Sequence, residues 1–111
     1  MMNKIKTVYL PTLRDRDKAW DIYEVPGTDA NLYVDGKQCR GVTRYFNREI
    51  CINKDLLPCD KRQVLIHELT HAFIYDTQIE TRDDYTEEHL CDFMAMYADD
   101  IIAAVDLVLS P

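Results

Sequence analysis

Residues 64–75 read VLIHELTHAFIY, a nearly unbroken apolar run that holds two histidines and a glutamate in H-E-x-x-H spacing. On an α-helix, residues four apart lie on the same face one turn above each other. The rings of His67 and His71 can therefore both reach one ion at the roughly 2.0–2.1 Å of a Zn–N bond. Glu68 lies beside such an ion, placed to take a proton from a water molecule. The stretch predicts a helix with a zinc site on one face.

The alternative is an ordinary helix whose two histidines are satisfied by partners in the protein core. Buried polar groups need hydrogen-bond partners, and residues 64–75 offer few polar neighbours to supply them. The metal site is therefore the favoured interpretation of His67 and His71.

The helix that carries the two histidines is expected to be central and buried. After Pro58, Asp60 is the predicted N-cap of the helix, because Gln63 follows three residues later with the spacing of a capping box. At 100° per residue, apolar side chains occupy nearly the whole circumference, with these residues opposite or flanking the histidines: Leu65, Leu69, Ala72 and Phe73, and Val64 and Ile74. The polar residues His67, Glu68, Thr70 and His71 are what a metal cleft in a core requires.

The residues before this helix predict strands. Alternating apolar and polar side chains indicate strands at residues 4–10, 20–25, 32–34, 42–46 and 49–53. Asp35-Gly36 is a hairpin signal between the third and fourth, and Asn47-Arg48 turns the chain into the fifth. Short connections favour antiparallel neighbours. We therefore expect an α+β fold in which an antiparallel β-meander of about three to five strands packs on the buried helix.

A second, C-terminal helix is predicted from Thr86, a plausible N-cap, to about Leu109. An apolar stripe with helical spacing runs along it and is expected to pack in the core: Leu90, Phe93, Met94, Tyr97, Ile101, Val105 and Val108. A polar loop, residues 76–85, is expected to join the two helices.

The start of the second helix supplies the third protein ligand that a two-histidine zinc site needs. Glu88 is followed by small Cys91 at +3 and by Asp92 at +4, so this face can approach the first helix closely. Asp92 can then accept the second ring N–H of a metal-bound histidine. Glu87 points more towards the apolar stripe, so Glu88 is preferred. The alternatives that stay open are Glu87, His89 and Asp84.

Length and charge limit the remaining possibilities. A chain of 111 residues with 47% hydrophobic residues fits a single globular domain, residues 1–111. Acidic residues outnumber basic ones 20 to 13, giving a net charge of −7, which argues against a nucleic-acid partner. The N-terminus lacks an apolar segment of the signal-peptide type, and residues 101–109 are too short to span a bilayer. A cytoplasmic protein that does not bind membranes is expected.

The four cysteines have none of the close C-x-x-C spacing that indicates a zinc ribbon or a redox motif. They are Cys39, Cys51, Cys59 and Cys91. In a reducing compartment they are expected to be small buried apolar residues rather than disulfides.

Two segments together carry a resemblance to a known family. Residues 67–72, HELTHA, followed by residues 88–95, EHLCDFMA, resemble the H-E-x-x-H and E-x-x-[small]-[Asn/Asp]-x-[apolar]-Ala pattern of the ImmA/IrrE-like minimal gluzincin metallopeptidases, common in phages and mobile elements. Residues 41–43 and 49–53 resemble the strands that precede the helix in that family. The resemblance covers roughly residues 41–98, about half of the chain.

The resemblance implies a minimal zincin-like domain with zinc held by His67, His71 and Glu88. Glu68 would be the general base, and Asp92 would support a ligand from behind. The implied activity is a zinc-dependent endopeptidase that acts on a cytoplasmic regulatory protein of a phage or mobile element. Candidate donors to the developing oxyanion are Tyr85, His89 and Tyr97.

The alternative function is a non-catalytic, zinc-stabilised module that binds a protein partner. Glu68 separates the two hypotheses, because a purely structural metal site has no need of a base beside its ligands. A nucleic-acid-associated SprT-like protease is disfavoured by the acidic charge and the lack of a zinc ribbon.

Overall fold

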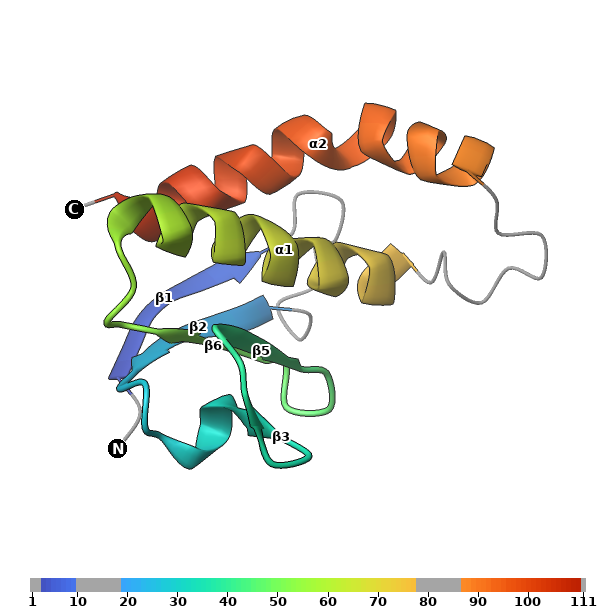
Figure 1. The fold of residues 1–111 in the computed structure, drawn as a ribbon. Coiled ribbons are helices and arrows are strands. Elements are labelled where there is room, and N and C mark those ends of the chain that lie inside the picture. Colours follow the sequence, from blue (N-terminus) through green and yellow to red (C-terminus); the bar gives the residue numbers. More distant parts are fainter. Residues whose placement is uncertain (1–2, 10–18, 78–86, 111) are drawn as a thin grey trace.

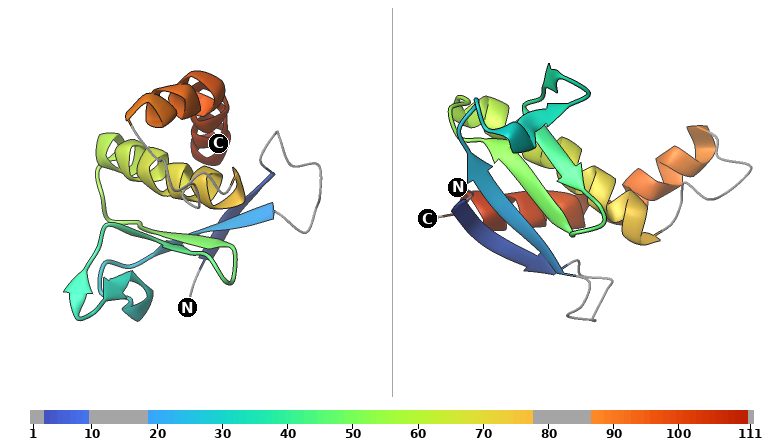
Figure 2. Two further views of the ribbon diagram at one scale, coloured as in Figure 1. Left: turned by 90° about the vertical axis from the view of Figure 1, so that its right-hand side faces the viewer. Right: turned by 90° about the horizontal axis from the view of Figure 1, so that it is seen from below.

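The computed structural model describes residues 3–9, 19–77 and 87–110 and has an α+β architecture. Both helices lie on the same side of a twisted sheet (Figures 1 and 2). Helix α1 lies against strands β5 and β6, and the C-terminal half of helix α2 comes down on strand β1. The elements are β1 (Asn3–Tyr9), β2 (Ala19–Val25), a 3-10 turn η2 (Ala30–Leu32), β3 (Tyr33–Val34), β4 (Lys37–Gln38), β5 (Gly41–Arg44), β6 (Glu49–Asn53), α1 (Pro58–Thr77) and α2 (Glu87–Leu109).

The main sheet is mixed, so the predicted antiparallel meander is wrong. Within the described ranges it has four strands in the order β1-β2-β6-β5. Strands β1 and β2 are antiparallel, as are β5 and β6, but β2 pairs with β6 in parallel, with Ile22 opposite Ile50. After β2 the chain passes through η2, β3 and β4 before it returns to the main sheet as β5 and β6. Strand β6 lies between β2 and β5, so β5 is the outer strand.

The Asp35-Gly36 turn forms as predicted, but it joins a different pair of strands. Asp35 and Gly36 both have positive φ angles, 52° and 80°, as a type I′ hairpin turn requires. The turn connects β3 to β4 in a separate two-stranded sheet, with Tyr33 opposite Gln38. The predicted strand at 42–46 corresponds to β5, which belongs to the main sheet.

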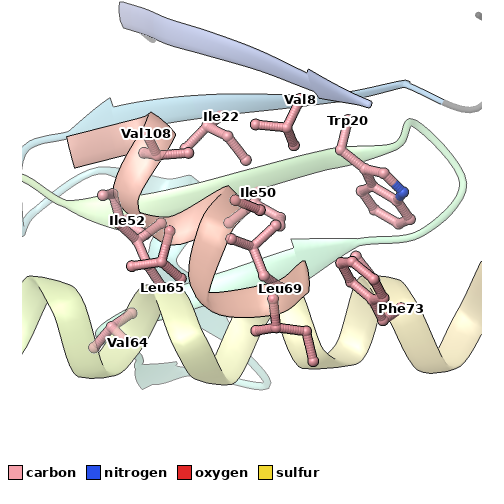
Figure 3. Packing of buried hydrophobic residues seen from close by; sticks show 14 of the residues in the cluster. Val8, Trp20, Ile22, Ile50, Ile52, Val64, Leu65, Leu69, Phe73 and Val108 are labelled. Atoms are coloured by element: carbon pink, nitrogen blue, oxygen red, sulfur yellow. The ribbon is translucent and has the colours of Figure 1, made fainter. Parts of the chain in front are cut away.

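The core lies between the sheet and the two helices. Strand β6 is central, and three consecutive residues of it, Ile50, Cys51 and Ile52, are fully buried. Figure 3 shows Ile22, Ile50 and Ile52 facing the apolar side of α1, with Val108 of α2 beside them. The α1 residues in this cluster are Val64, Leu65, Leu69, Ala72 and Phe73.

Helix α1 begins two residues before the predicted N-cap. Pro58 occupies the first position, where its fixed φ suits a helix and its missing N–H costs nothing, and the Lys61 N–H bonds the Leu57 carbonyl at 2.9 Å. Asp60 lies within the first turn, where its negative charge interacts favourably with the positive N-terminal end of the helix dipole. The helix extends to Thr77, so Asp76 belongs to it and not to the predicted loop.

The prediction that α1 is central and buried holds for one side of the helix and not for the side that carries the histidines. Its sheet-facing and α2-facing residues are buried, but His67 and Tyr75 are exposed. The reason is that the sheet ends at β5, so the side of α1 that carries the histidines extends beyond the covered surface. The histidine face is therefore open to solvent.

Helix α2 places only part of its apolar stripe in the core. Phe93, Ile101, Val105 and Val108 are buried, whereas Leu90 and Met94 are exposed. The first turns of α2 lie beyond the sheet, where fewer elements cover them (Figure 1). Of the two helices that the structure describes, neither is long and apolar enough to cross a membrane.

All four cysteines are free thiols, as expected, but they are not all buried. Cys51 is buried in the sheet and Cys39 is half-buried, whereas Cys59 and Cys91 are exposed at the first turns of their helices. Burial raises the pKa of the Cys51 thiol above its ordinary value, an effect that nearby Arg44 partly offsets.

Candidate functional site

The two histidines of the H-E-x-x-H stretch face each other on α1. The Nε2 atoms of His67 and His71 are 3.2 Å apart, and their rings are nearly perpendicular, at 79°. An ion bonded to both atoms at about 2.0–2.1 Å would see them at an angle of roughly 100°, close to tetrahedral. The same separation also suits a hydrogen bond from one ring N–H to the other ring's bare nitrogen. The separation of the two Nε2 atoms is thus compatible with two ligands of one tetrahedral ion and also with a direct hydrogen bond.

Glu68 lies beside the histidine pair in a different environment. Its side chain is 8% exposed, against 68% for His67, and its Oε2 is 3.9 Å from the His67 Nε2. The Thr43 hydroxyl of β5 lies 2.8 Å from Glu68 Oε1 and 3.2 Å from the Glu68 carbonyl oxygen. One carboxylate oxygen is thus held by the sheet, and the other is on the histidine side.

Gly41 allows β5 to lie this close to α1. A Cβ atom at residue 41 would be 2.6 Å from Val64 Cγ1 and 3.1 Å from Glu68 Cγ. Real Cβ atoms essentially never show a contact as short as 2.6 Å, so with a larger residue here the Val64 side chain, the helix or the strand would have to shift. Glycine here serves close approach, and Thr43, two residues on, reaches Glu68 because of it.

The predicted third ligand is not tested by the described residues. Helix α2 begins at Glu87, which places Glu87 and Glu88 in its first turn, but their side chains and that of Asp92 lie outside the described structure. Asp84 and Tyr85 also lie outside it. Among the described side chains, no group of three His, Cys, Asp or Glu residues could hold a metal.

The structure shows the contacts of two other polar residues that the sequence singled out, Tyr97 and Thr70. The Tyr97 ring packs against Phe73 and Phe93, with ring centroids 5.8 and 5.1 Å away, which makes it part of the core. Thr70 donates to the Ile66 carbonyl of its own helix at 2.6 Å. Neither residue is brought to the histidine pair by these contacts.

A group of aromatic residues beside His71 was missed by the sequence analysis. Tyr45, in the turn between β5 and β6, lies edge-on to the His71 ring at 6.4 Å and 5.0 Å from the ring of Tyr75. The buried Trp20 ring lies behind both tyrosines, at 6.5 and 6.1 Å. Tyr75 lies four residues after His71, which places the two on one helix face, but nothing in the local sequence pairs Tyr45 with them.

An ion pair fixes the turn that carries Tyr45. Arg48 donates to both oxygens of Asp76, at 2.9 and 2.7 Å, and Trp20 Nε1 donates to the same carboxylate at 2.7 Å. The Asp76 side chain is 2% exposed. The Arg48 guanidinium also stacks 4.6 Å from the centre of the Trp20 ring. This network ties the β5-β6 turn to the last turn of α1.

Two cavities flank the histidine pair. One, of about 460 Å³, is lined by Cys39, Arg40, Gly41, Gln63, Val64, His67 and Glu68. The other, of about 360 Å³, is lined by Tyr45, His71, Ile74 and Tyr75. His67 and Glu68 thus line the first cavity, and His71 lines the second, aromatic one.

Comparisons of this chain with family models, with curated proteins and with solved structures give no match, so the resemblance drawn from the sequence rests on the residues quoted for it alone.

Proposed function

We propose that the protein is a zinc-dependent endopeptidase with a minimal zincin-like domain. The observation that carries the proposal is the 3.2 Å separation of the His67 and His71 Nε2 atoms, with Glu68 Oε2 beside them. A metal site that only stabilised the fold would not need the Glu68 carboxylate beside the two histidines. Zinc bound here would supply an acidified water and polarise the carbonyl of the peptide bond.

The roles of the protein residues follow from their positions. His67 and His71 would hold the ion, with Glu88 as the predicted third ligand and Asp92 supporting a histidine ring. Glu68 would take a proton at Oε2 and return it to the leaving amine. Thr43 keeps Oε1 bonded throughout, which holds the carboxylate in one orientation.

The outer edge of β5 gives a peptide a place to lie. The Asn53 N–H bonds the Arg40 carbonyl at 2.9 Å, and bonded pairs alternate along an antiparallel ladder. The backbone groups of Gly41 and Thr43 therefore point away from β6. No described strand pairs with that edge. An extended peptide added there would lie beside Glu68 and the histidines, which favours an endopeptidase over an enzyme for small molecules.

The biological setting is proposed from the resemblance. A cytoplasmic regulatory protein of a phage or mobile element is the expected substrate, and the net charge of −7 disfavours nucleic acid. The alternative, a zinc-stabilised binding module, predicts the same metal and no hydrolysis.

Metal analysis and a single isosteric variant test the proposal. The purified protein should hold close to one zinc per chain, measured by plasma mass spectrometry, and His67→Ala or His71→Ala should remove it. Gln63→Ala, on the same helix and exposed, is the matched control and should keep the metal. Stoichiometric zinc in the His71→Ala protein would contradict the assignment.

Catalysis is separated from metal binding by Glu68→Gln, which keeps the shape of the side chain but cannot accept a proton. This variant should retain zinc and its fold while losing cleavage of fluorescently labelled, unfolded casein. If neither the natural protein nor the variant cuts casein or peptide mixtures, the binding-module hypothesis replaces the peptidase.

A further inference from the structure

The two cavities lie along one seam, between strand β5 and helix α1, which we call the groove. Strand β5 and helix α1 run side by side in the same direction: Gly41 lies against Val64, Thr43 against Glu68, and Tyr45 against His71. The cavity that Arg40 and Gly41 line lies at the Gly41 end of this seam, and the aromatic cavity lies at the Tyr45 end. A peptide paired with the outer edge of β5 would therefore meet both cavities, with the histidine pair between them.

The Tyr45 end is built to receive an apolar side chain. Tyr45, Tyr75 and Ile74 line it together with His71. The two tyrosine rings are partly exposed, yet both contact the fully buried Trp20, which Asp76 and Arg48 hold in place. The wall is thus rigid before a ligand arrives, and little side-chain entropy is lost on binding. Aromatic and large aliphatic groups gain most from such a wall.

The Gly41 end carries a positive charge. Arg40 is exposed and lines the cavity next to His67. Among the described residues, Lys61 pairs with Glu24 and Arg62 pairs with Asp106. None of the ion pairs found there involves Arg40. The net charge of −7 repels acidic peptides in general, but at physiological salt charges more than about 8 Å apart are largely screened. Glu68 lines the same cavity, but its side chain is only 8% exposed, so Arg40 is the charge that a peptide meets from the solvent side.

We infer that the groove selects an extended peptide with an aromatic or large aliphatic side chain at the Tyr45 end and an acidic side chain at the Arg40 end. Strand pairing is residue by residue, and side chains on one face of a strand are an even number of positions apart. Gly41 and Tyr45 are four positions apart along the chain, so the two side chains of the peptide should lie about four positions apart, close to 13 Å at about 3.3 Å per residue. The peptide bond that is cut lies between them. This inference rests on the proposed function for the cut, but peptide selection is measurable without it.

The test uses a degenerate library of twelve-residue peptides, with products identified by mass spectrometry. The zinc-loaded protein should enrich aromatic or large aliphatic residues on one side of the cut and Asp or Glu on the other, with the predicted spacing. Tyr45→Ala should lower kcat/KM for a selected peptide by about tenfold to 100-fold, because a hydrophobic pocket residue is lost. Arg40→Glu should change the acidic preference to a basic one, with a smaller shift of about fivefold, since the charge is exposed.

Two matched controls lie on the separate β3-β4 sheet. Tyr33 is an exposed tyrosine and Lys37 an exposed cation, so Tyr33→Ala and Lys37→Glu change the same chemistry away from the groove. Both variants should leave the selection unchanged. Loss of selectivity in a control equal to that in the groove variants would overturn the inference.

Binding to the Glu68→Gln protein distinguishes a failed inference from a failed function. The fluorescein-labelled selected peptide should bind this variant by fluorescence anisotropy, and a peptide with Ala at both selected positions should bind at least tenfold more weakly. Selective binding, with no cutting by the natural protein, would contradict the peptidase proposal and support the inference on peptide selection. Cutting of the library with no preference on either side of the bond would keep the peptidase and sink the inference.

Discussion

The hydroxyl of Thr43 on the outer strand donates to the buried carboxylate of Glu68 on α1, with 2.8 Å between Oγ1 and Oε1. The Glu68 carbonyl oxygen is a second acceptor at 3.2 Å, but the hydroxyl has one proton, and a charged acceptor forms the stronger bond. The contact crosses from sheet to helix. It fixes which carboxylate oxygen is on the histidine side.

Thr43→Val removes the hydroxyl and keeps the shape of the side chain. We expect kcat to fall about tenfold to 100-fold, because general-base catalysis depends on position and contributes about 10²–10⁴-fold in total. KM and zinc content should stay unchanged. Thr43→Ser, which keeps the hydroxyl, should restore most of the rate. Equal losses in the Val and Ser variants would show that Thr43 packs rather than positions.

The third ligand is predicted to be Glu88 and not its neighbour. Glu88→Ala should lower zinc affinity by orders of magnitude in competition with a chromophoric chelator, whereas Glu87→Ala should not. Asp92→Ala should show the smaller loss, roughly 10–100-fold, expected of a residue that orients a ligand. The opposite order for Glu87 and Glu88 would mean that the helix presents its other glutamate to the histidines.

Gly41→Ala tests the close approach of β5 to α1. The added Cβ would meet Val64 at 2.6 Å, so the strand or helix must shift. Overpacking of this kind destabilises by about 1–3 kcal/mol. We expect that loss in urea unfolding, together with lower activity, because Thr43 and Glu68 move apart. A fully active, equally stable alanine variant would show that the two elements can separate at no cost.

Asp76→Ala should be among the most destabilising changes on α1. It leaves the half-buried Arg48 guanidinium and the Trp20 N–H without this partner, and breaking a buried pair costs up to about 3–5 kcal/mol. Asp106→Ala, which breaks the exposed pair with Arg62, should cost about 0–1 kcal/mol. Urea unfolding followed by Trp20 fluorescence gives both values. Similar losses for the two variants would contradict the structural role of Asp76.

The thiols should react with Ellman's reagent in an order set by exposure and pKa. Cys59 and Cys91 are exposed and should react within the first phase. Cys51 is buried and has a raised pKa, so it holds less thiolate at any given pH and should react only when the protein unfolds. Single Cys→Ser variants assign each phase. A fast reaction of Cys51 in the native protein would show that the sheet opens readily.

Local patterns predicted the parts of the fold that local physics controls. The H-E-x-x-H spacing and the capping-box pattern of Asp60 and Gln63 identified α1, and Asp35-Gly36 identified a turn with positive φ angles. The pairing of His67 with His71 followed from helix geometry alone. In each case the deciding contacts lie within a few residues of one another along the chain.

What the sequence analysis missed depends on contacts between distant segments. The parallel pairing of β2 with β6 was not predicted, although three consecutive apolar residues in Ile50-Cys51-Ile52 are typical of a strand covered on both faces. Tyr45 contacts His71 from a turn whose Arg48 pairs with Asp76 at the end of α1. No local pattern encodes such a contact.

The parallel pairing of β2 with β6 also sets an order of assembly for the chain. The antiparallel pair β1-β2 can form from its own residues, but β2 gains its second neighbour only after Asn53 has been added, and α1 follows directly. Parallel pairing across a long loop is slow because closure entropy is lost before the contacts form. During synthesis the apolar face of β2 therefore stays uncovered until β6 has been made, and the histidine helix α1 is the element made directly after it.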